Sequence, residues 1–263
     1  MNRVVVSAAD KSMHTLASQF ATDFSIPLAT QNISADFVLE FAQECVRVLD
    51  MRSGKAVEIK VDFTEGANVH RMKYGGGKGQ AIAKAVGVSA KVKPSVLDAT
   101  AGMGKDAFVL AGLGCSVSML ERSPVAYALL HNGLLRARKF IEENNGEEFA
   151  QLAETIRRMQ LQDGDALNFL KNAENESVNV VYLDPMFPER EKSSKVKKDM
   201  RAFQQLVGKD DDADALLDLA LKAAENRVVV KRPNHAPFLA QREPGYQLKG
   251  KSSRFDIYSK KKL

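Results

Sequence analysis

A carboxylate, two prolines and an aromatic residue follow an apolar run and give the sequence its clearest chemical signal. The segment VVYLDPMFPERE, residues 180–191, passes from strand-forming residues into Asp184, Pro185, Met186 and Phe187. The Asp184 carboxylate and the Pro185 carbonyl can accept both N–H groups of an exocyclic amine and orient its lone pair. Phe187 offers a ring on which a flipped base can stack. We therefore predict a catalytic site of Asp184, Pro185 and Phe187; a strand end with a proline stop and a buried Phe is the alternative.

A glycine turn lies upstream, in VLDATAGMGKDAF at residues 96–108. Gly102 and Gly104 separate an apolar run from a helical one, so a ligand can approach the backbone and a helix N-terminus there. Glu121 ends the next apolar run, 19 residues after Gly102, where a carboxylate can accept hydrogen bonds from both hydroxyls of a ribose. The pattern predicts a nucleoside-bearing ligand; a tight turn beside a surface glutamate is the alternative.

Charges around the turn separate the candidate ligands. A P-loop is excluded, because the glycines are too close together and Lys105 is followed by Asp106 instead of Ser or Thr. GMGKDA does satisfy the nicotinamide fingerprint G-x-G-x-x-A, so a nicotinamide-dependent oxidoreductase stays open. Asp98, at the preceding strand end, would repel a pyrophosphate and attract an ammonium group. Together with the zwitterionic pair Lys105 and Asp106, it favours S-adenosylmethionine as the cofactor.

A third acidic residue follows a further apolar run. Asp165, in LQDGDAL, is placed to accept a hydrogen bond from an adenine amino group. An Asp-Gly turn that caps the next helix explains the same residues almost equally well. The sequence leaves both interpretations open.

The elements that must position these residues fall into two regions. From about residue 95, apolar strands alternate with amphipathic helices, which is typical of a parallel sheet with helices on both faces. Ligands bind such sheets beyond the carboxyl ends of the strands, where these acidic residues occur. Residues 1–71 instead hold short β-rich runs around one helix near residues 13–24. We predict an α/β fold with a small N-terminal α+β unit at 1–71 and a Rossmann-like, mostly parallel domain at 72–263.

Composition limits the class of protein. The chain has 263 residues, 44% of them hydrophobic, enough for one large domain and a small appendage. Cys45 and Cys115 provide no disulfide framework, and the four histidines are scattered, so we expect a reducing compartment and no metal. We find neither a signal-peptide core nor an apolar run of about 20 residues. These features predict a cytoplasmic protein without membrane partners.

Longer motifs carry a family resemblance. They are HRMKYGGGKGQAIAKAVG, DATAGMGKDAFVLAGLG, MLERSPV, VVYLDPMFPEREKSSKVKKDMRAFQQLVG, VVVKRP and RFDIY. Together they resemble the bacterial small-subunit (16S) ribosomal RNA guanine-N2 methyltransferase J family over most of residues 60–258, and less clearly before residue 60. The resemblance implies a class I S-adenosylmethionine-dependent methyltransferase fold. It also implies methyl transfer to the 2-amino group of one guanosine near the 3′ end of 16S rRNA.

The resemblance also implies cofactor contacts, carried over position by position. They fall on Lys105, Asp106, Glu121, Arg122, Asp165, Ala166 and Asp184. Lys105 stands where the family has Arg, and Asp165 and Ala166 stand where it has paired serines. Met186 departs from the wider Asn/Asp-Pro-Pro-Phe/Tyr pattern, which leaves the carbonyl of Pro185 in place.

Basic residues occur in three stretches that we expect near the same edge of the sheet. They are Lys73 and Lys78, then Arg190, Lys195, Lys197 and Lys198, and finally Lys231 and Arg232. One such stretch is usually a solvated face, but three at one edge predict phosphate contacts with 16S rRNA or the small ribosomal subunit. A non-catalytic RNA-binding module is the remaining alternative, although it would need neither Glu121 nor Asp184. Oligomeric state and the assembly state of the substrate are left open.

Overall fold

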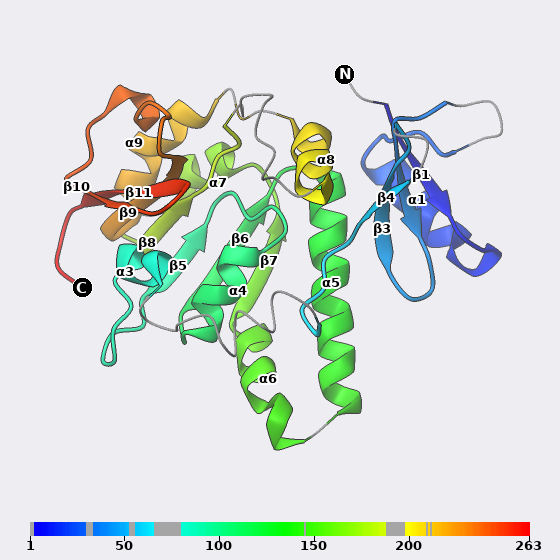
Figure 1. Cartoon of the computed structure of the whole chain (residues 1–263), viewed down its shortest axis with the longest axis horizontal. Helices are drawn as coiled ribbons and strands as arrows, with labels where there is room; N and C mark the ends of the chain where they lie inside the picture. The colour runs from blue at the N-terminus through cyan, green and yellow to red at the C-terminus, as the bar shows by residue number, and fades with distance from the viewer. Residues whose placement is uncertain are drawn as a thin grey trace. The chain divides into compact units, whose positions relative to one another are not determined.

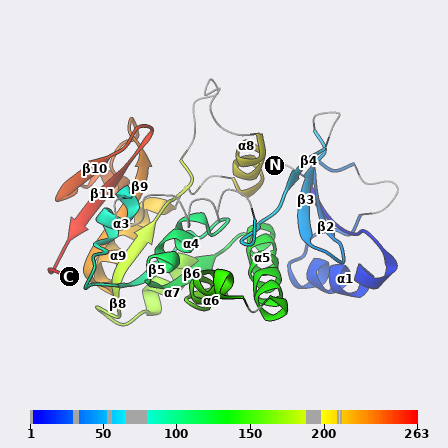
Figure 2. The ribbon, with the colours of Figure 1, turned by 60° about the horizontal axis from the view of Figure 1, so that its bottom comes forward.

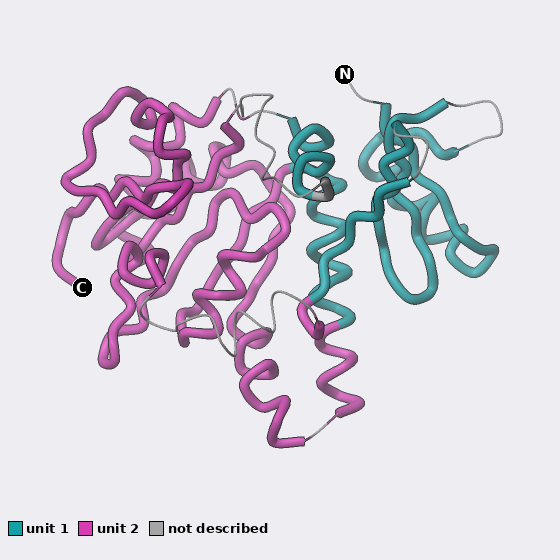
Figure 3. The backbone as a smooth tube through the Cα atoms, in the orientation of Figure 1, with its two compact units in different colours: residues 1–62, 123–136, 188–208 teal, residues 63–122, 137–187, 209–263 magenta. Residues whose placement is uncertain are grey.

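The computed structural model describes residues 3–29, 34–52, 56–65, 80–144, 146–187, 198–208, 210 and 212–263, with the side chains of residues 198 and 199 excepted. The chain divides into two compact units (Figure 3). Unit 1 comprises residues 1–62, 123–136 and 188–208, and unit 2 comprises residues 63–122, 137–187 and 209–263. The domain boundary predicted at residue 71 lies outside the described residues and stays a prediction.

Unit 2 contains a seven-stranded sheet (Figure 1). Its strands, in spatial order, are β10 (Tyr246–Lys249), β11 (Ser253–Ser259), β9 (Ala224–Pro233), β8 (Val178–Leu183), β5 (Ser95–Asp98), β6 (Ser116–Glu121) and β7 (Met159–Asp163). β9, β8, β5, β6 and β7 are parallel neighbours, whereas β11 runs antiparallel to both β9 and β10. The predicted mostly parallel sheet of an α/β fold is confirmed.

Helices cover both faces of this sheet (Figures 1 and 2). α3 (Ala81–Val86) contacts β9 and β11, and α4 (Lys105–Gly112) contacts β6 and β7. The opposite layer consists of α7 (Ala166–Asn172) and α9 (Ala213–Ala223), which pack on each other, with α9 also on β8 and β9. Further described helices are α5 (Pro124–Glu143), α6 (Ala150–Arg157) and the short η3 (Glu147–Phe149) and η4 (Leu239–Gln241).

The strand β8 lies at the centre of the sheet, and its residues are almost completely buried. Val180, Val181, Tyr182 and Leu183 are each at most 1% exposed. A continuous apolar run without alternation is expected of a parallel strand that helices cover on both faces. On the α7 and α9 side, Val181 and Leu183 share a core cluster with residues of α9. The strand that carries Asp184 at its end is therefore rigidly held.

Unit 1 contains a separate four-stranded sheet, in the order β1 (Val4–Ala8), β2 (Phe37–Phe41), β3 (Val46–Asp50) and β4 (Val57–Ile59). β1 and β2 are parallel and the other pairs antiparallel. Buried and half-buried residues alternate along β2 and β3, so one face is covered. α1 (His14–Asp23), which follows η1 (Lys11–Met13), packs on β1 and β2, and α8 (Lys198–Val207) contacts β4.

None of the helices within the described ranges has both the length and the apolar character that crossing a bilayer requires.

Candidate functional site

The candidate residues of unit 2 gather at the carboxyl ends of its parallel strands. β5 ends at Asp98, β6 ends at Glu121, and Asp184 directly follows β8. Because these strands are parallel and adjacent, their carboxyl ends share one edge of the sheet. The structure thus brings the strand-end residues together as the sequence pattern predicts.

The glycine turn connects β5 to α4 and supports Glu121. Gly102 (φ 54°) and Gly104 (φ 68°) both have left-handed backbone conformations, which only glycine adopts without strain. The Gly102 N–H donates to Oε2 of Glu121 at 2.7 Å. Glu121 is 6% exposed, so the turn fixes this carboxylate at the end of β6.

Asp98 is the most deeply buried carboxyl group of the candidate site, at 2% exposure. Burial raises the pKa of Asp98 to about 8, and the neighbouring carboxylates of Asp106, Asp184 and Glu121 act in the same direction. The Thr100 N–H donates to Asp98 Oδ1 at 3.2 Å, while Thr100 Oγ1 accepts the Asp184 N–H at 2.6 Å. Thr100 therefore couples the end of β5 to the turn after β8.

Four residues form what we call the Lys231 cluster: Lys231, Asp106, Asp184 and Tyr182. The Lys231 Nζ donates to Oδ2 of Asp106 at 2.7 Å and to Oδ2 of Asp184 at 2.8 Å. The Tyr182 hydroxyl, on a side chain almost fully buried, donates to the same Asp106 oxygen at 2.8 Å. Burial acts to lower the pKa of Lys231, but the two carboxylates outweigh it and raise that pKa. Burial, then Asp106, raises the pKa of Tyr182.

A second group, which we call the Arg122 cluster, consists of Arg122, Asp165, Asp210 and Asp212. The Arg122 guanidinium is hydrogen-bonded to Asp210, lies 2.8 Å from Asp212 Oδ2, and lies 3.8 Å from Asp165 Oδ2. Asp210 Oδ2 also accepts the Met186 N–H at 2.7 Å. The cluster therefore connects the end of β6 to the turn that follows β8.

Asp165 and Ala166 begin a helix. Asp165 is the N-cap of α7 and accepts the Asn168 N–H at 2.9 Å, and Ala166 is the first helical residue, 7% exposed. Helix capping, one of the two interpretations of Asp165, is thus observed in the structure. An adenine contact by the same carboxylate stays a prediction.

Phe187 has one ring face in contact with a buried cation. Arg232 Cζ lies 4.7 Å from the ring centroid of Phe187, and Arg232 is 6% exposed. The Arg232 guanidinium also donates to the Pro237 carbonyl at 3.2 Å. His235, which the sequence analysis missed, meets the Phe187 ring edge-on at a centroid distance of 6.2 Å. A base could therefore stack only on the ring face that Arg232 leaves open.

The predicted phosphate-binding residues have mixed outcomes. Lys73, Lys78, Arg190, Lys195 and Lys197 lie outside the described residues, and Lys198 is described by its backbone alone, at the start of α8. Lys231 and Arg232 do not form an exposed basic face. Lys231 is paired with two carboxylates, and Arg232 is buried against Phe187 and a carbonyl. A charged group that is removed from water needs such partners, and here the partners engage the charged groups of both residues.

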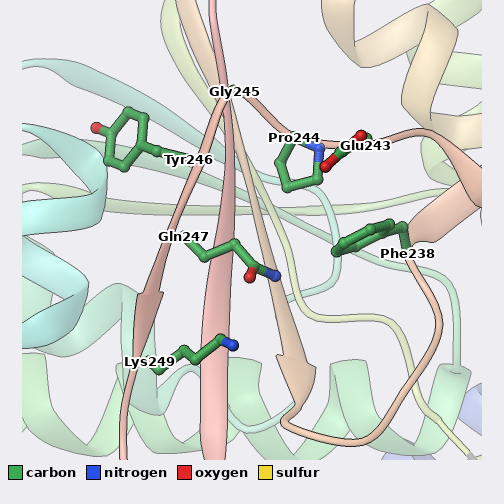
Figure 4. A pocket seen from close by; sticks show the side chains of 7 residues that line it. All are labelled: Phe238, Glu243, Pro244, Gly245, Tyr246, Gln247 and Lys249. Carbon is green, nitrogen blue, oxygen red and sulfur yellow. The ribbon is translucent and has the colours of Figure 1, made fainter.

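A surface pocket of about 530 Å³ occurs elsewhere in unit 2 (Figure 4). It is lined by Phe238, Glu243, Pro244, Gly245, Tyr246, Gln247 and Lys249. None of the strand-end residues contributes to it, so the pocket does not define the candidate site.

The strand-end residues fit S-adenosylmethionine. The fit test is the donor set itself: Glu121 is a buried carboxylate fixed by Gly102, and Asp98 is a buried carboxyl at the glycine turn, whose raised pKa a nearby ammonium would lower again by stabilising its ionised form. Carboxylates favour an ammonium, a sulfonium and ribose hydroxyls, whereas they would repel the pyrophosphate of a dinucleotide. The chemistry of these residues therefore fits a cationic nucleoside.

Comparison with known proteins agrees with this fit. The family model described as "Putative SAM-dependent methyltransferase" matches residues 20–260. A crystal structure of a SAM-dependent methyltransferase from Neisseria gonorrhoeae is similar at a TM-score of 0.69 and 32% identity, covering 97% of this chain and 95% of that one. The fold is thus that of an S-adenosylmethionine-dependent methyltransferase, and the chain matches that class over most of its length.

Curated relatives narrow the class to one family. A protein of Cellvibrio japonicus is 49% identical over 253 residues, 94% of both chains, and one of Pseudomonas fluorescens is 47% identical over 262 residues, covering 100% of this chain and 96% of that one. Both are named ribosomal RNA small subunit methyltransferase J, and this chain belongs to that family. The predicted fold, cofactor and family are confirmed. The oxidoreductase and the non-catalytic module receive no support from these relatives.

Proposed function

We propose that the protein transfers a methyl group from S-adenosylmethionine to the exocyclic 2-amino group of a guanosine near the 3′ end of 16S rRNA. The names of the relatives support small-subunit rRNA as the substrate. One observation of the structure supports an amine as the acceptor. Asp184 follows the buried strand β8, next to the glycine turn; Lys231 donates to its carboxylate, and Thr100 Oγ1 accepts its backbone N–H.

Four residues are the strongest candidates to hold the cofactor: Asp98, Gly102, Gly104 and Glu121. Glu121 would accept the ribose hydroxyls, and Asp98 would face the ammonium group at the glycine turn. Lys105 begins α4 at the same turn and is a candidate for the carboxylate of the amino acid. Asp106, Arg122 and Asp165 already have protein partners, so we propose that they shape the site more than they contact the cofactor.

The turn after β8 would act on the acceptor base. The lone pair of an exocyclic amine is delocalised into the ring, so it must be turned toward an electrophile. Asp184 and the Pro185 carbonyl would accept both N–H groups and turn it. Phe187 would stack on the base with its open face, since Arg232 covers the other. S-adenosylmethionine, when bound, supplies an electrophilic methyl group, and the ionised Asp184 can take up the proton that the amine releases.

Phosphate contacts would come from the basic residues outside the strand-end site. We propose Lys73, Lys78, Arg190, Lys195, Lys197 and Lys198 for this role, on the sequence pattern alone. Lys231 and Arg232 are not included, because their charged groups are engaged within unit 2.

The test is a methyl-transfer assay with S-adenosylmethionine and 16S rRNA, free and in small subunits, followed by mass spectrometry of the product nucleosides. We expect N2-methylguanosine. Phe187→Ala should weaken productive RNA binding by about 1–3 kcal/mol, and Phe169→Ala, which removes an exposed aromatic side chain on α7, is the matched control. Recovery of N7-methylguanosine or a ribose methyl alone would contradict the proposal, since neither acceptor atom is an exocyclic amine.

A further inference from the structure

Lys231 connects two parts of the candidate site that are distant in sequence. Its ammonium group is hydrogen-bonded to Asp184, 47 positions away, and to Asp106, 125 positions away. Asp106 lies in the first turn of α4, after the glycine turn, and Asp184 begins the acceptor turn after β8. Lys231 therefore joins the cofactor side of the site to the acceptor side.

This contact determines which oxygen of Asp184 can meet a substrate. Lys231 occupies Oδ2 at 2.8 Å, and the Asp184 N–H is held by Thr100 at 2.6 Å. Within the described parts of the chain, no hydrogen bond reaches the other oxygen, Oδ1. With the backbone and one oxygen held, rotation of the carboxylate is restricted and the Oδ1 lone pairs point in a fixed direction.

The charge of Lys231 also affects the ionisation of Asp184. Burial raises the pKa of Asp184, Lys231 opposes this increase, and the carboxylates of Asp106 and Asp210 add to it. Asp98 and Tyr182 interact with the same carboxylate. Without the ammonium group, Asp184 would keep its proton to higher pH, and a protonated carboxyl is a weaker acceptor for an amine N–H.

We infer that Lys231 is a positioning residue for methyl transfer, which holds Asp184 Oδ2 so that Oδ1 accepts the N–H of the target amine. The inference rests on the proposed function, because it requires a base amine at Asp184. It also assigns to Lys231 a role other than phosphate contact. One ammonium against the two carboxylates of Asp106 and Asp184 leaves a net charge of about −1, so the site still favours a cationic sulfonium.

The test compares Lys231→Met with Lys231→Arg, and uses Lys222→Met, an exposed lysine of α9, as the matched control. With 16S rRNA as substrate, Lys231→Met should lower kcat by about tenfold or more, with KM for RNA and Kd for S-adenosylmethionine changed by less than about threefold. The acid limb of its kcat profile should move to higher pH. Lys231→Arg should restore most of kcat, since a guanidinium keeps the charge and can donate to both carboxylates.

A second measurement uses the free protein. Carbon-13 NMR of the aspartate carboxyl groups should show Asp184 titrating at higher pH in Lys231→Met than in the wild type, with no such change in Lys222→Met. An unshifted titration with unchanged kcat would overturn the inference. So would a loss of activity that follows weaker RNA binding and a flatter salt dependence, because that result indicates a phosphate contact.

A different result would contradict the proposed function itself. If the wild-type protein itself forms no N2-methylguanosine, the proposed function is wrong and the inference falls with it. If the wild type forms this product but Lys231→Arg loses as much kcat as Lys231→Met, only the inference is overturned.

Discussion

The Lys231 cluster and the Arg122 cluster use the same kind of interaction for different purposes. Each has one cation shared among carboxylates at the carboxyl edge of the sheet. The Lys231 cluster includes the buried Tyr182, and its Asp184 side chain is directed to the chemistry we propose. The side chains of Lys231 and Asp184 are 28% and 38% exposed, and those of Arg122 and Asp212 are 38% and 41% exposed, so the exposure of the two ion pairs differs little. In the Arg122 cluster, however, the contact to the acceptor turn is through a backbone N–H.

This difference indicates what each cluster can affect. A partly exposed ion pair contributes about 0–1 kcal/mol to stability, so the two clusters should differ more in their effect on the rate than in their effect on stability. A pair that fixes a reacting group affects the rate, and a pair that fixes the backbone affects it only indirectly. We therefore expect the largest effects in the Lys231 cluster and the smallest in the Arg122 cluster.

The largest effect should come from Asp184→Ala. Loss of one preorganised acceptor should lower kcat by roughly 10²-fold or more. Binding of S-adenosylmethionine must be measured separately by calorimetry, because Asp184 is also implied as a cofactor contact. Asp212→Ala, which removes a carboxylate of the Arg122 cluster, should leave kcat unchanged. Equal losses in both variants would remove the distinction between the clusters.

The next largest effect should come from Glu121→Ala, and it should appear in the binding of S-adenosylmethionine. It removes charge-assisted hydrogen bonds to a ribose and should weaken S-adenosylmethionine binding by roughly 1.5–3 kcal/mol. Calorimetry of the folded variant measures this change. Unaltered affinity would mean that the carboxylate only supports the Gly102 N–H, as it does at 2.7 Å in this structure.

Most elements, and the edge at which the site lies, could be predicted from the sequence. The helix expected near residues 13–24 is α1 (His14–Asp23), and the strand–helix alternation expected from about residue 95 is that of unit 2, because burial leaves a direct mark on composition. α3 and α6 were missed, since helices of 6 and 8 residues show too few turns for a clear period. α8 was missed because its basic neighbourhood was interpreted as a phosphate-binding stretch.

The pairing of charges could not be predicted. Because the carboxyl ends of parallel strands share one edge, Asp98, Glu121 and Asp184 could be placed there from the sequence. The sequence does not indicate which of the charged side chains are hydrogen-bonded to each other. Lys231 and Asp106 are 125 positions apart, and only the packed sheet brings them together. The same holds for Arg232, which lies within β9 near its carboxyl end and is covered by Phe187 and the Pro237 carbonyl.

The buried Asp98, which belongs to neither cluster, should make stability depend on pH. The pKa of Asp98 is raised from 3.8 to about 8 in the folded protein, so between these values the folded state keeps a proton that the unfolded state has lost. The free energy of unfolding should therefore fall as pH rises through this window, by on the order of 1 kcal/mol per pH unit. Asp98→Asn should flatten the slope in chemical denaturation series. Equal slopes for wild type and Asp98→Asn would refute the prediction.

The smallest effects should come from the two carboxylates that Arg122 binds most closely. Asp212→Ala should change the free energy of unfolding by less than about 1 kcal/mol, and this change should shrink in high salt, because the pair is exposed and screened. Asp210→Ala removes, in addition, the acceptor of the Met186 N–H. It should therefore cost about 0.5–1.5 kcal/mol more and lower kcat by a few-fold, since the turn that carries Asp184 loses one of its supports. Denaturation at low and high salt and steady-state kinetics of both variants measure the contrast. If the two variants behave alike, Asp210 does not position the turn, and the Arg122 cluster is only a surface ion network.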